Sequence, residues 1–333
     1  MLGGGGLKAS DSRRWQNAPH VLRSVELLDL VFDHLERQDI RMYRLSSSTV
    51  PYGTHPDLPQ FDYRGQIGEA AAALAELGAR ARRLGLRLST HPGQYTVLNS
   101  PDESIVAKAL GDVEQDALLL DALGQGREAV VVVHVGGVYG DREAALDRWT
   151  AAYGRLSERA RGRLVVEHDE RCFDLGDVLE LHRRVGVPVV FDSHHHRCKP
   201  WRAVDRMDEL LALAAGTWPD GVRPKVHVSS PRSELREVGR GKDARLVAPL
   251  LEQHADFPSP WDVADILRAL RRPTDVMLEA KAKDLAVLWT RAQLERLAPP
   301  LAAAEERSAG QPAQHEPEER VPQGRLAERA RAA

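Results

Sequence analysis

The chain has few of the features that mark membrane or secreted proteins. No apolar run approaches the roughly 18 uncharged residues that a transmembrane helix needs, and the first residues lack the basic, apolar and small-residue blocks of a signal peptide. There are two cysteines, Cys172 and Cys198, which could pair, although a lone pair in a cytosolic chain is more often reduced. We therefore expect a cytoplasmic protein without a membrane partner, and nothing in the sequence points to an obligate protein partner.

A bulk excess of positive charge is also lacking. The formal net charge is -3, from 46 Lys and Arg against 49 Asp and Glu. This balance argues against a histone-like protein that binds nucleic acid through total charge, although a local basic surface could still hold a phosphate backbone. The hydrophobic content of 42% over 333 residues is ordinary for a globular protein and predicts a sizeable core.

Seven short apolar runs alternate with longer Ala-, Leu-, Arg- and Glu-rich segments, a pattern typical of repeated strand-helix units around a parallel sheet. No Gly-rich dinucleotide turn follows the first run, which favours a (β/α) barrel over a two-domain doubly wound enzyme. Residues 1–300 are predicted to form this domain, and residues 301–333, rich in Pro, Gln, Glu and Arg, are predicted to be a disordered tail. Helices are expected, for example, at 66–84 and 104–124, and the predicted strands are 40–47, 86–92, 129–137, 163–169, 187–195, 223–230 and 275–281.

Six of the seven predicted strands end their apolar run in a side chain that can bind a metal. Because side chains alternate across a strand, Val132 and His134 share a face, as do Val165 and Glu167. In a barrel, the carboxyl ends of the strands form the mouth where active sites are built. The six candidate ligands are His91, His134, Glu167, Asp192, His227 and Glu279.

A single such residue is more often a cap or a satisfied core group than a ligand. Six at equivalent positions are different, because carboxylates and imidazoles gathered in one low-dielectric pocket are costly unless a cation compensates. Mixed His and carboxylate ligation favours Mn, Zn or Fe over Mg or Ca, and bridging carboxylates favour more than one ion. We therefore predict a divalent-metal cluster, which would supply a hydroxide nucleophile and stabilise charge on a phosphoryl group.

Lys225 and the loop 91–101 leave alternatives open. Lys225 shares a face with His227 and would repel metals if it were protonated, so it contacts substrate phosphate, is neutralised by burial, is chemically modified, or is a salt-bridged structural lysine. The loop places Gln94 and Tyr95 just beyond His91. Alone it is a turn with an exposed aromatic, but beside a metal cluster these two residues could stack with bases or wedge between them.

The ordered motifs of the chain resemble those of the ultraviolet damage endonucleases, which cleave DNA beside UV photoproducts. The match runs from about residue 7 to residue 290, includes loops as well as strands, and is highly specific as an ordered set. Endonuclease IV and xylose isomerase-like barrels share the architecture but not these motifs. The motifs are RMYRLSS, THPDLPQF, LSTHPGQYTVLNSP, VVVHVGGVYGD, LVVEHDER, VFDSHHHRC, KVHVSSPR, HADF and MLEAKAKD.

The resemblance implies a TIM (β/α)8 barrel with a site for three divalent ions, manganese first and zinc or magnesium as alternatives. It implies hydrolysis of the phosphodiester on the 5′ side of a cyclobutane dimer, a 6-4 photoproduct or an abasic site in UV-damaged double-stranded DNA. Gln94 and Tyr95 would probe the lesion, and Lys225, Glu167 and His227 would carry the catalysis. The implied ligands are His91, His134, Glu167, Asp192, His195, His227, His254, Glu279 and Lys225, the last as a lysine that can be carboxylated.

The resemblance also distinguishes implied ligands from the residues next to them in the sequence. In the run of three histidines it selects His195 as the ligand and leaves His194 and His196 as flanking groups that support the site or face DNA. Arg197, Lys199 and Arg202 could hold the DNA backbone, although a solvated charge run is the more common reading.

The chain departs from the family at its start. Family members begin with a strand of the type RLGY, whereas this chain begins MLGGGGLKASDSRRWQNAPH, which aligns after that strand. Either the natural start lies upstream, or the barrel lacks its first strand and leaves two edges unpaired, so that an upstream segment would restore solubility and activity. The competing functions are a xylose isomerase-like metal-dependent sugar isomerase and a catalytically inactive DNA-damage binding protein.

Overall fold

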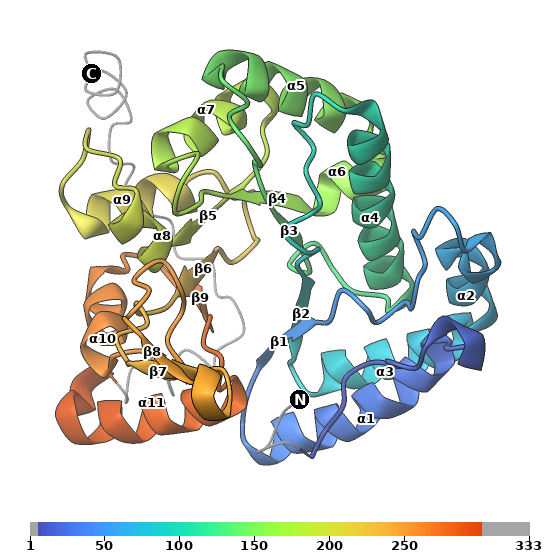
Figure 1. Ribbon diagram of the computed structural model, residues 1–333, viewed down its shortest axis with the longest axis horizontal. Helices are drawn as coiled ribbons and strands as arrows, with labels where there is room; N and C mark the ends of the chain where they lie inside the picture. The colour runs from blue at the N-terminus through green and yellow to red at the C-terminus, as the bar shows by residue number, and fades with distance from the viewer. Residues whose placement is uncertain (1–5, 302–333) are drawn as a thin grey trace.

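A curved parallel sheet forms the centre of the computed structural model, which describes residues 6–301. Neighbouring strands in the sheet pair in parallel, in the order in which they occur along the chain. Helices lie around the outside of the sheet (Figure 1). The strands are β1 (Met42–Leu45), β2 (Arg87–Thr90), β3 (Val131–His134), β4 (Leu164–Glu167), β5 (Val189–Asp192), β6 (Lys225–Val228) and β9 (Asp275–Leu278).

The helices that connect the strands begin and end at residues with capping roles. In α7, for example, Asp174 and Asp177 form a capping box, and the helix stops at Gly186, whose φ of 73° suits glycine. The helices are α1 (Val21–Arg37), α2 (Tyr63–Glu69), α3 (Ala71–Arg83), α4 (Glu103–Ala122), α5 (Arg142–Arg155), α6 (Glu158–Arg163), α7 (Leu175–Val185), α8 (Ser193–Cys198), α9 (Met207–Ala215), α10 (Pro260–Ala269) and α11 (Asp284–Leu297).

Alternation along the strands divides the core into two clusters. Val131 and Val133 belong to the large cluster between the sheet and the helices. Val132, Val165 and Val190 belong to a second, smaller cluster inside the sheet. The residues two positions further along β3, β4 and β5 are His134, Glu167 and Asp192. Because side chains alternate across a strand, these polar residues lie above the inner cluster, at the carboxyl ends of the strands.

The sheet forms a nearly closed barrel, as the sequence predicted. Within residues 6–301, β1 and β9 are the two ends of the seven-stranded sheet and do not pair with each other (Figure 1). A cleft of about 2180 Å³ lies between them and is lined by residues of both strands. The barrel is therefore open on one side, next to the end of β9 that leads to Glu279.

Two predicted elements differ from the structure, and one element was not predicted. The segment 66–84 forms two helices instead of one, because Ala70 departs from helical geometry with φ -94° and ψ 5° and ends α2. The buried Gln66 of α2 donates to the carbonyl oxygens of Pro51 and Phe61. The strand predicted at 187–195 ends at Asp192, which caps α8. An antiparallel hairpin of β7 (Arg236–Val238) and β8 (Arg245–Val247) was not predicted.

Two further features bear on the sequence predictions. Cys172 and Cys198 are both free thiols. Within residues 6–301, none of the helices combines the length and apolar character that crossing a bilayer requires. The predicted tail, apart from Leu301, lies outside the described residues.

Candidate metal centre

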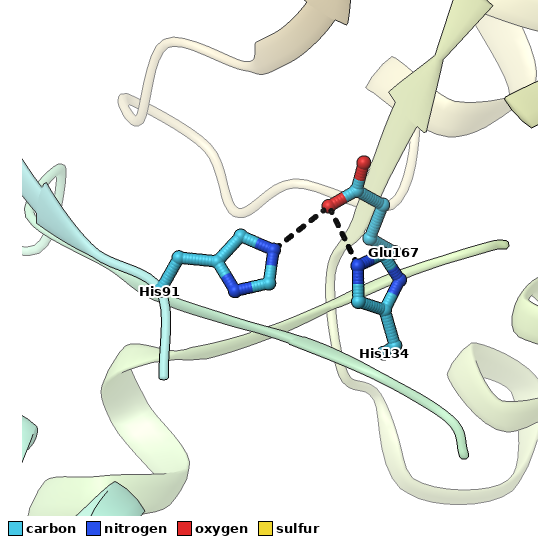
Figure 2. A group of neighbouring side chains, drawn as sticks. All are labelled: His91, His134 and Glu167. Carbon is cyan, nitrogen blue, oxygen red and sulfur yellow. Dashed lines mark ion pairs between the residues drawn. The ribbon is translucent and has the colours of Figure 1, made fainter. Parts of the chain in front are cut away.

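Glu167, the last residue of β4, lies at the centre of a cluster at the mouth of the barrel. Its carboxylate is fully buried, and Oε1 accepts a hydrogen bond from Nδ1 of His227 at 2.9 Å. On the other side, Oε2 lies 3.4 Å from Nε2 of His91 and 4.0 Å from Nε2 of His134 (Figure 2). His91, His134 and Glu167 stand at the ends of the neighbouring strands β2, β3 and β4, so the sheet register brings them together.

A second group shares this carboxylate. Ligand atoms of Glu167, Asp192, His227 and Glu279 all lie within 4.8 Å of one another, as do those of Glu167, His91 and His134 in the first group. A carboxylate that belongs to two groups of donors can bridge two ions. Each of the two groups is a set of donors that could hold a divalent metal ion.

His195 and His254 complete the set from outside the strands. Asp192 ends β5 and begins α8, since its Oδ1 accepts from the backbone N–H groups of His194 and His195 at 2.7 and 2.8 Å. This turn brings Nδ1 of His195 to 3.4 Å from Oε1 of Glu167. Nε2 of His254 lies 3.8 Å from Oε2 of Glu279. The structure thus brings all eight predicted His, Asp and Glu ligands to one end of the barrel.

The buried polar atoms of the cluster fit a metal ion. Oε2 of Glu167, Oδ2 of Asp192 and Nδ1 of His134 are buried and have no hydrogen-bond partner among the described residues. Burial of an unpaired carboxylate oxygen is costly, and a cation is the partner that compensates this cost. Oxygen donors mixed with imidazoles suit divalent transition ions.

Burial also shifts the pKa values of the cluster. It raises the pKa of Asp192 to about 7, with His195 opposing and the neighbouring carboxylates of Glu167 and Glu279 reinforcing the shift. Burial lowers the pKa of His227 to about 4, so that its imidazole is neutral, which is the form that binds metals. The neighbouring imidazoles and Arg44 hold the pKa values of Glu167 and Glu279 below their usual range despite burial, so Asp192 is the carboxyl of the three whose ionisation a bound cation would favour.

Lys225, the first residue of β6, is buried below the cluster at 1% exposure. Its Nζ donates a hydrogen bond to Oγ of Ser89 at 2.9 Å. Burial lowers the pKa of Lys225 well below its usual value, and the nearby Arg44 and Arg87 lower it further. Lys225 forms no ion pair within residues 6–301, so the described residues offer no partner for the salt-bridged alternative, and burial disfavours the charged form of the amine.

The loop 91–101 projects beyond His91 and is tied down behind its tip. Oγ1 of Thr96 donates to Oδ2 of Asp112 at 2.8 Å, and Nδ2 of Asn99 donates to the carbonyl oxygen of Gly137 at 2.9 Å. Gln94 and Tyr95 stay exposed at the tip, with Tyr95 at 78%. The two residues predicted to probe DNA therefore lie on a supported, solvent-facing turn beside the cluster.

Residues 10–300 match the model of the UV-endonuclease UvdE family. The chain belongs to this family. The UV DNA damage endonuclease of Bacillus velezensis is 36% identical to it over 252 residues, which cover 75% of this chain and 73% of that protein. The crystal structure of SacUVDE superposes with a TM-score of 0.72 at 25% identity, covering 88% of this chain and 94% of that one. The resemblance seen in the ordered motifs is thus confirmed, and membership of the UvdE family indicates an endonuclease.

A more distant likeness concerns the fold alone. Endonuclease IV from Thermus thermophilus has a TM-score of 0.55 at 16% identity, with coverage of 81% of this chain and 95% of that one. The barrel architecture of this UvdE-family chain is therefore shared with other nucleases.

Sequence reasoning missed Arg44 of β1, which enters the cluster of this UvdE-family chain. Its guanidinium pairs with Glu279, and Nη2 lies 3.0 Å from Nε2 of His227. The available signal was a charged residue inside an otherwise apolar strand, between Tyr43 and Leu45. Arg44 supplies a fixed positive charge at the side of the cluster next to the open edge.

His194 and His196 do not face solvent in this family member. They are 1% and 9% exposed, so the alternative that they face DNA is wrong. His168, which was not singled out, accepts a hydrogen bond from the backbone N–H of Asp192 at its Nε2, 3.0 Å away. Its backbone carbonyl oxygen lies 3.0 Å from Nδ1 of His195. These buried histidines support the turn that places Asp192 and His195.

Proposed function

We propose that this UvdE-family chain is a metal-dependent DNA repair endonuclease. It hydrolyses the phosphodiester 5′ to cyclobutane pyrimidine dimers, 6-4 photoproducts and abasic sites in double-stranded DNA, and leaves 3′-hydroxyl and 5′-phosphate ends. The observation that carries the proposal is the cluster of eight His, Asp and Glu side chains around the shared carboxylate of Glu167. The names of its relatives support damaged DNA as the substrate.

The cluster holds three divalent ions in this proposal, with manganese preferred and zinc or magnesium as alternatives. When bound, such ions generate a hydroxide nucleophile and stabilise the charge that develops on the phosphoryl group. Glu167 belongs to both donor groups and therefore sets their spacing. We assign catalysis to Glu167 and His227, which are hydrogen-bonded to each other, and to Lys225. The neutral form of His227 is the one that binds metals, and its two ring nitrogens lie against Glu167 and Arg44.

Lys225 is carboxylated in this proposal. Its neutral Nζ attacks CO₂, an N–C bond forms, and one proton leaves to solvent, so that the amine becomes a carbamate anion. Three observations support this: the side chain is buried, it donates to the neutral Ser89, and no carboxylate is paired with it within residues 6–301. A carbamate would be an anionic ligand on the same face of β6 as His227.

Gln94 and Tyr95 probe the lesion from the tip of the loop 91–101. Their exposure and the anchored base of the loop support this role. A lesion unstacks and kinks DNA more easily than normal pairs do, so insertion of these side chains costs less at damage than elsewhere. Selectivity then comes from deformability and does not need contacts to base edges.

Nicking of UV-irradiated supercoiled plasmid in the presence of Mn²⁺ tests the proposal. The wild-type protein is expected to nick irradiated plasmid and to leave unirradiated plasmid intact. His134→Ala removes an imidazole from the cluster and is expected to lower nicking by about two orders of magnitude or more. His182→Ala is the matched control, since His182 lies on α7 and bonds the carbonyl oxygen of Val187 instead.

The same assay separates the competing functions. Lesion binding without nicking would support an inactive damage-binding protein. Neither binding nor nicking, with turnover of a sugar, would support an isomerase of the xylose isomerase type. Normal nicking by His134→Ala would contradict the metal assignment.

A further inference from the structure

Tyr139 is a second exposed aromatic at the mouth of the barrel. It lies on the loop that follows β3 and therefore follows His134, and it is 50% exposed. Neither the motif predictions nor the cluster assigns it a role. A half-exposed aromatic close to a nucleic-acid site offers a flat apolar surface to a base.

The backbone at Tyr139 is in a conformation that its side chain disfavours. Its φ is 53°, in the left-handed region, and Gly140 follows with a φ of 83°. Glycine adopts this region without steric cost, whereas a bulky residue is strained there. A turn in which the N–H of Asp141 donates to the carbonyl oxygen of Val138 at 3.2 Å holds the segment in place. Strain kept at an exposed aromatic points to a use other than stability.

The ring is supported by groups behind it. The guanidinium carbon of Arg148 lies 5.6 Å from the ring centroid, which is within the range of a cation-π contact. Gly137 also packs closely, since an added Cβ there would lie 3.0 Å from two ring atoms of Tyr139. A side chain at position 137 would push the ring by a few tenths of an ångström, so glycine favours this placement.

The same supports connect the ring to the loop that carries Tyr95. Nε of Arg148 donates to the carbonyl oxygen of Asn99 at 2.8 Å, and Asn99 in turn bonds Gly137. The loops after β2 and β3 are thus joined behind two exposed tyrosines. The same two strands lead to His91 and His134, whose imidazole centroids lie 5.1 Å apart.

From this arrangement we infer that Tyr139 stacks on an unpaired base of the damaged duplex, beside the base contacts of the Gln94–Tyr95 loop. The inference rests on the proposed function, since it takes DNA as the substrate, and it adds a binding residue that the lesion-probing pair does not include. Its ligand is a nucleobase freed from its pair, and the stacking is tolerant of base identity because each base has a π-face.

Binding measured in EDTA, where cleavage is prevented, tests the role of the ring. A duplex with one abasic site and the same duplex without it are compared by fluorescence anisotropy. Tyr139→Ala is expected to weaken binding of the damaged duplex by roughly 5- to 150-fold, with little change for the intact duplex, and Tyr139→Phe to bind as the wild type does.

Tyr139→Gly separates binding from folding. Glycine relieves the strain at φ 53°, so the melting temperature is expected to stay equal or rise while binding of the damaged duplex falls as for Tyr139→Ala. Tyr153→Ala is the matched control on α5, where the ring of Tyr153 stacks on Trp149 at 5.6 Å. It is expected to keep wild-type affinity for both duplexes.

Three results would overturn the inference: wild-type affinity of Tyr139→Ala and Tyr139→Gly, equal losses on both duplexes, or a loss of binding that appears only with a lowered melting temperature. Nicking by the wild-type protein tests the proposed function separately. If the wild-type protein does not nick irradiated plasmid in Mn²⁺, the proposed function fails, whatever the variants bind in EDTA.

Discussion

Lys225 illustrates how the charge state of a buried residue in this barrel depends on the groups that it contacts. An amine at 1% exposure with a serine hydroxyl as its partner is stable only in its neutral form or after modification. Glu167 and Asp192 pose the opposite case, with buried carboxylate oxygens that have no partner among the described residues. At the residue scale, the site thus combines buried carboxylate oxygens without a partner among the described residues and a buried lysine whose charged form is disfavoured.

Incorporation of ¹³C from bicarbonate tests the modification of Lys225. We expect a carbamate carbon signal in the NMR spectrum of the wild-type protein, because the neutral amine reacts with dissolved CO₂. Lys225→Ala is expected to lack this signal and to lose about 10- to 100-fold in nicking. Lys242→Ala, at an exposed position in the β7–β8 hairpin, should retain both. A wild-type spectrum without the signal in CO₂-saturated buffer would refute carboxylation.

The loop 91–101 is the element to which we assign lesion probing in the proposed function, and Asp112 of α4 supports it. Its Oδ2 accepts from Oγ1 of Thr96 and from Nζ of Lys108, both at 2.8 Å, and its Oδ1 accepts from Oγ1 of Thr54 at 2.5 Å. One carboxylate therefore joins the loops after β1 and β2 to a helix. This gives the tip at Tyr95 a fixed base.

Asp112→Asn is expected to weaken this support, because an amide accepts fewer hydrogen bonds than a carboxylate does. We expect kcat/KM on irradiated DNA to fall by roughly tenfold, or about 1.4 kcal/mol, in the same direction as for Tyr95→Ala. The control is Asp147→Asn, at a surface ion pair with Arg184. Unchanged kcat/KM in Asp112→Asn would show that the loop does not need this anchor.

The sequence predicted the strands that a local apolar pattern specifies. It did not predict the points at which the surrounding structure ends an element. The seven parallel strands were predicted because apolar β-branched runs are visible along the chain. The strand predicted to run to 195 stops at Asp192, since the capping of α8 takes over at that carboxylate. Segment 66–84 is divided at Ala70, where the backbone departs from helical geometry, although the Ala- and Leu-rich pattern continues through this residue.

The whole molecule is expected to be more stable with metal than without it. A ligand that binds only the folded protein stabilises it by about 2.7 kcal/mol at a hundred times its Kd. For a domain of this size we expect Mn²⁺ to raise the melting temperature by roughly 5 °C or more relative to EDTA. Asp192→Asn should lose most of this shift, and Asp265→Asn, a surface residue paired with Arg268, should keep it. An equal shift in both variants would place the metal outside the cluster.

The sequence by itself determined the strands, their parity and six His, Asp and Glu candidates at the strand ends. These follow from the period of two along a strand and from the placement of polar residues at strand ends, which are local properties. His195 and His254 were predicted only from the resemblance to the family. Local pattern also placed Tyr95 on a turn, but it said nothing of Tyr139, whose importance depends on Arg148 and Asn99 behind it.

Only the tertiary structure decided how the donors are shared and what surrounds them. Ser89 and Lys225 are 136 residues apart in sequence, and Arg44 and Glu279 are 235 apart, yet each pair is in contact. Such pairs meet because the barrel brings distant strands to one mouth, and neither member carries a local signal of its partner. The charge of each buried group, and hence the chemistry of the site, is set by these long-range contacts.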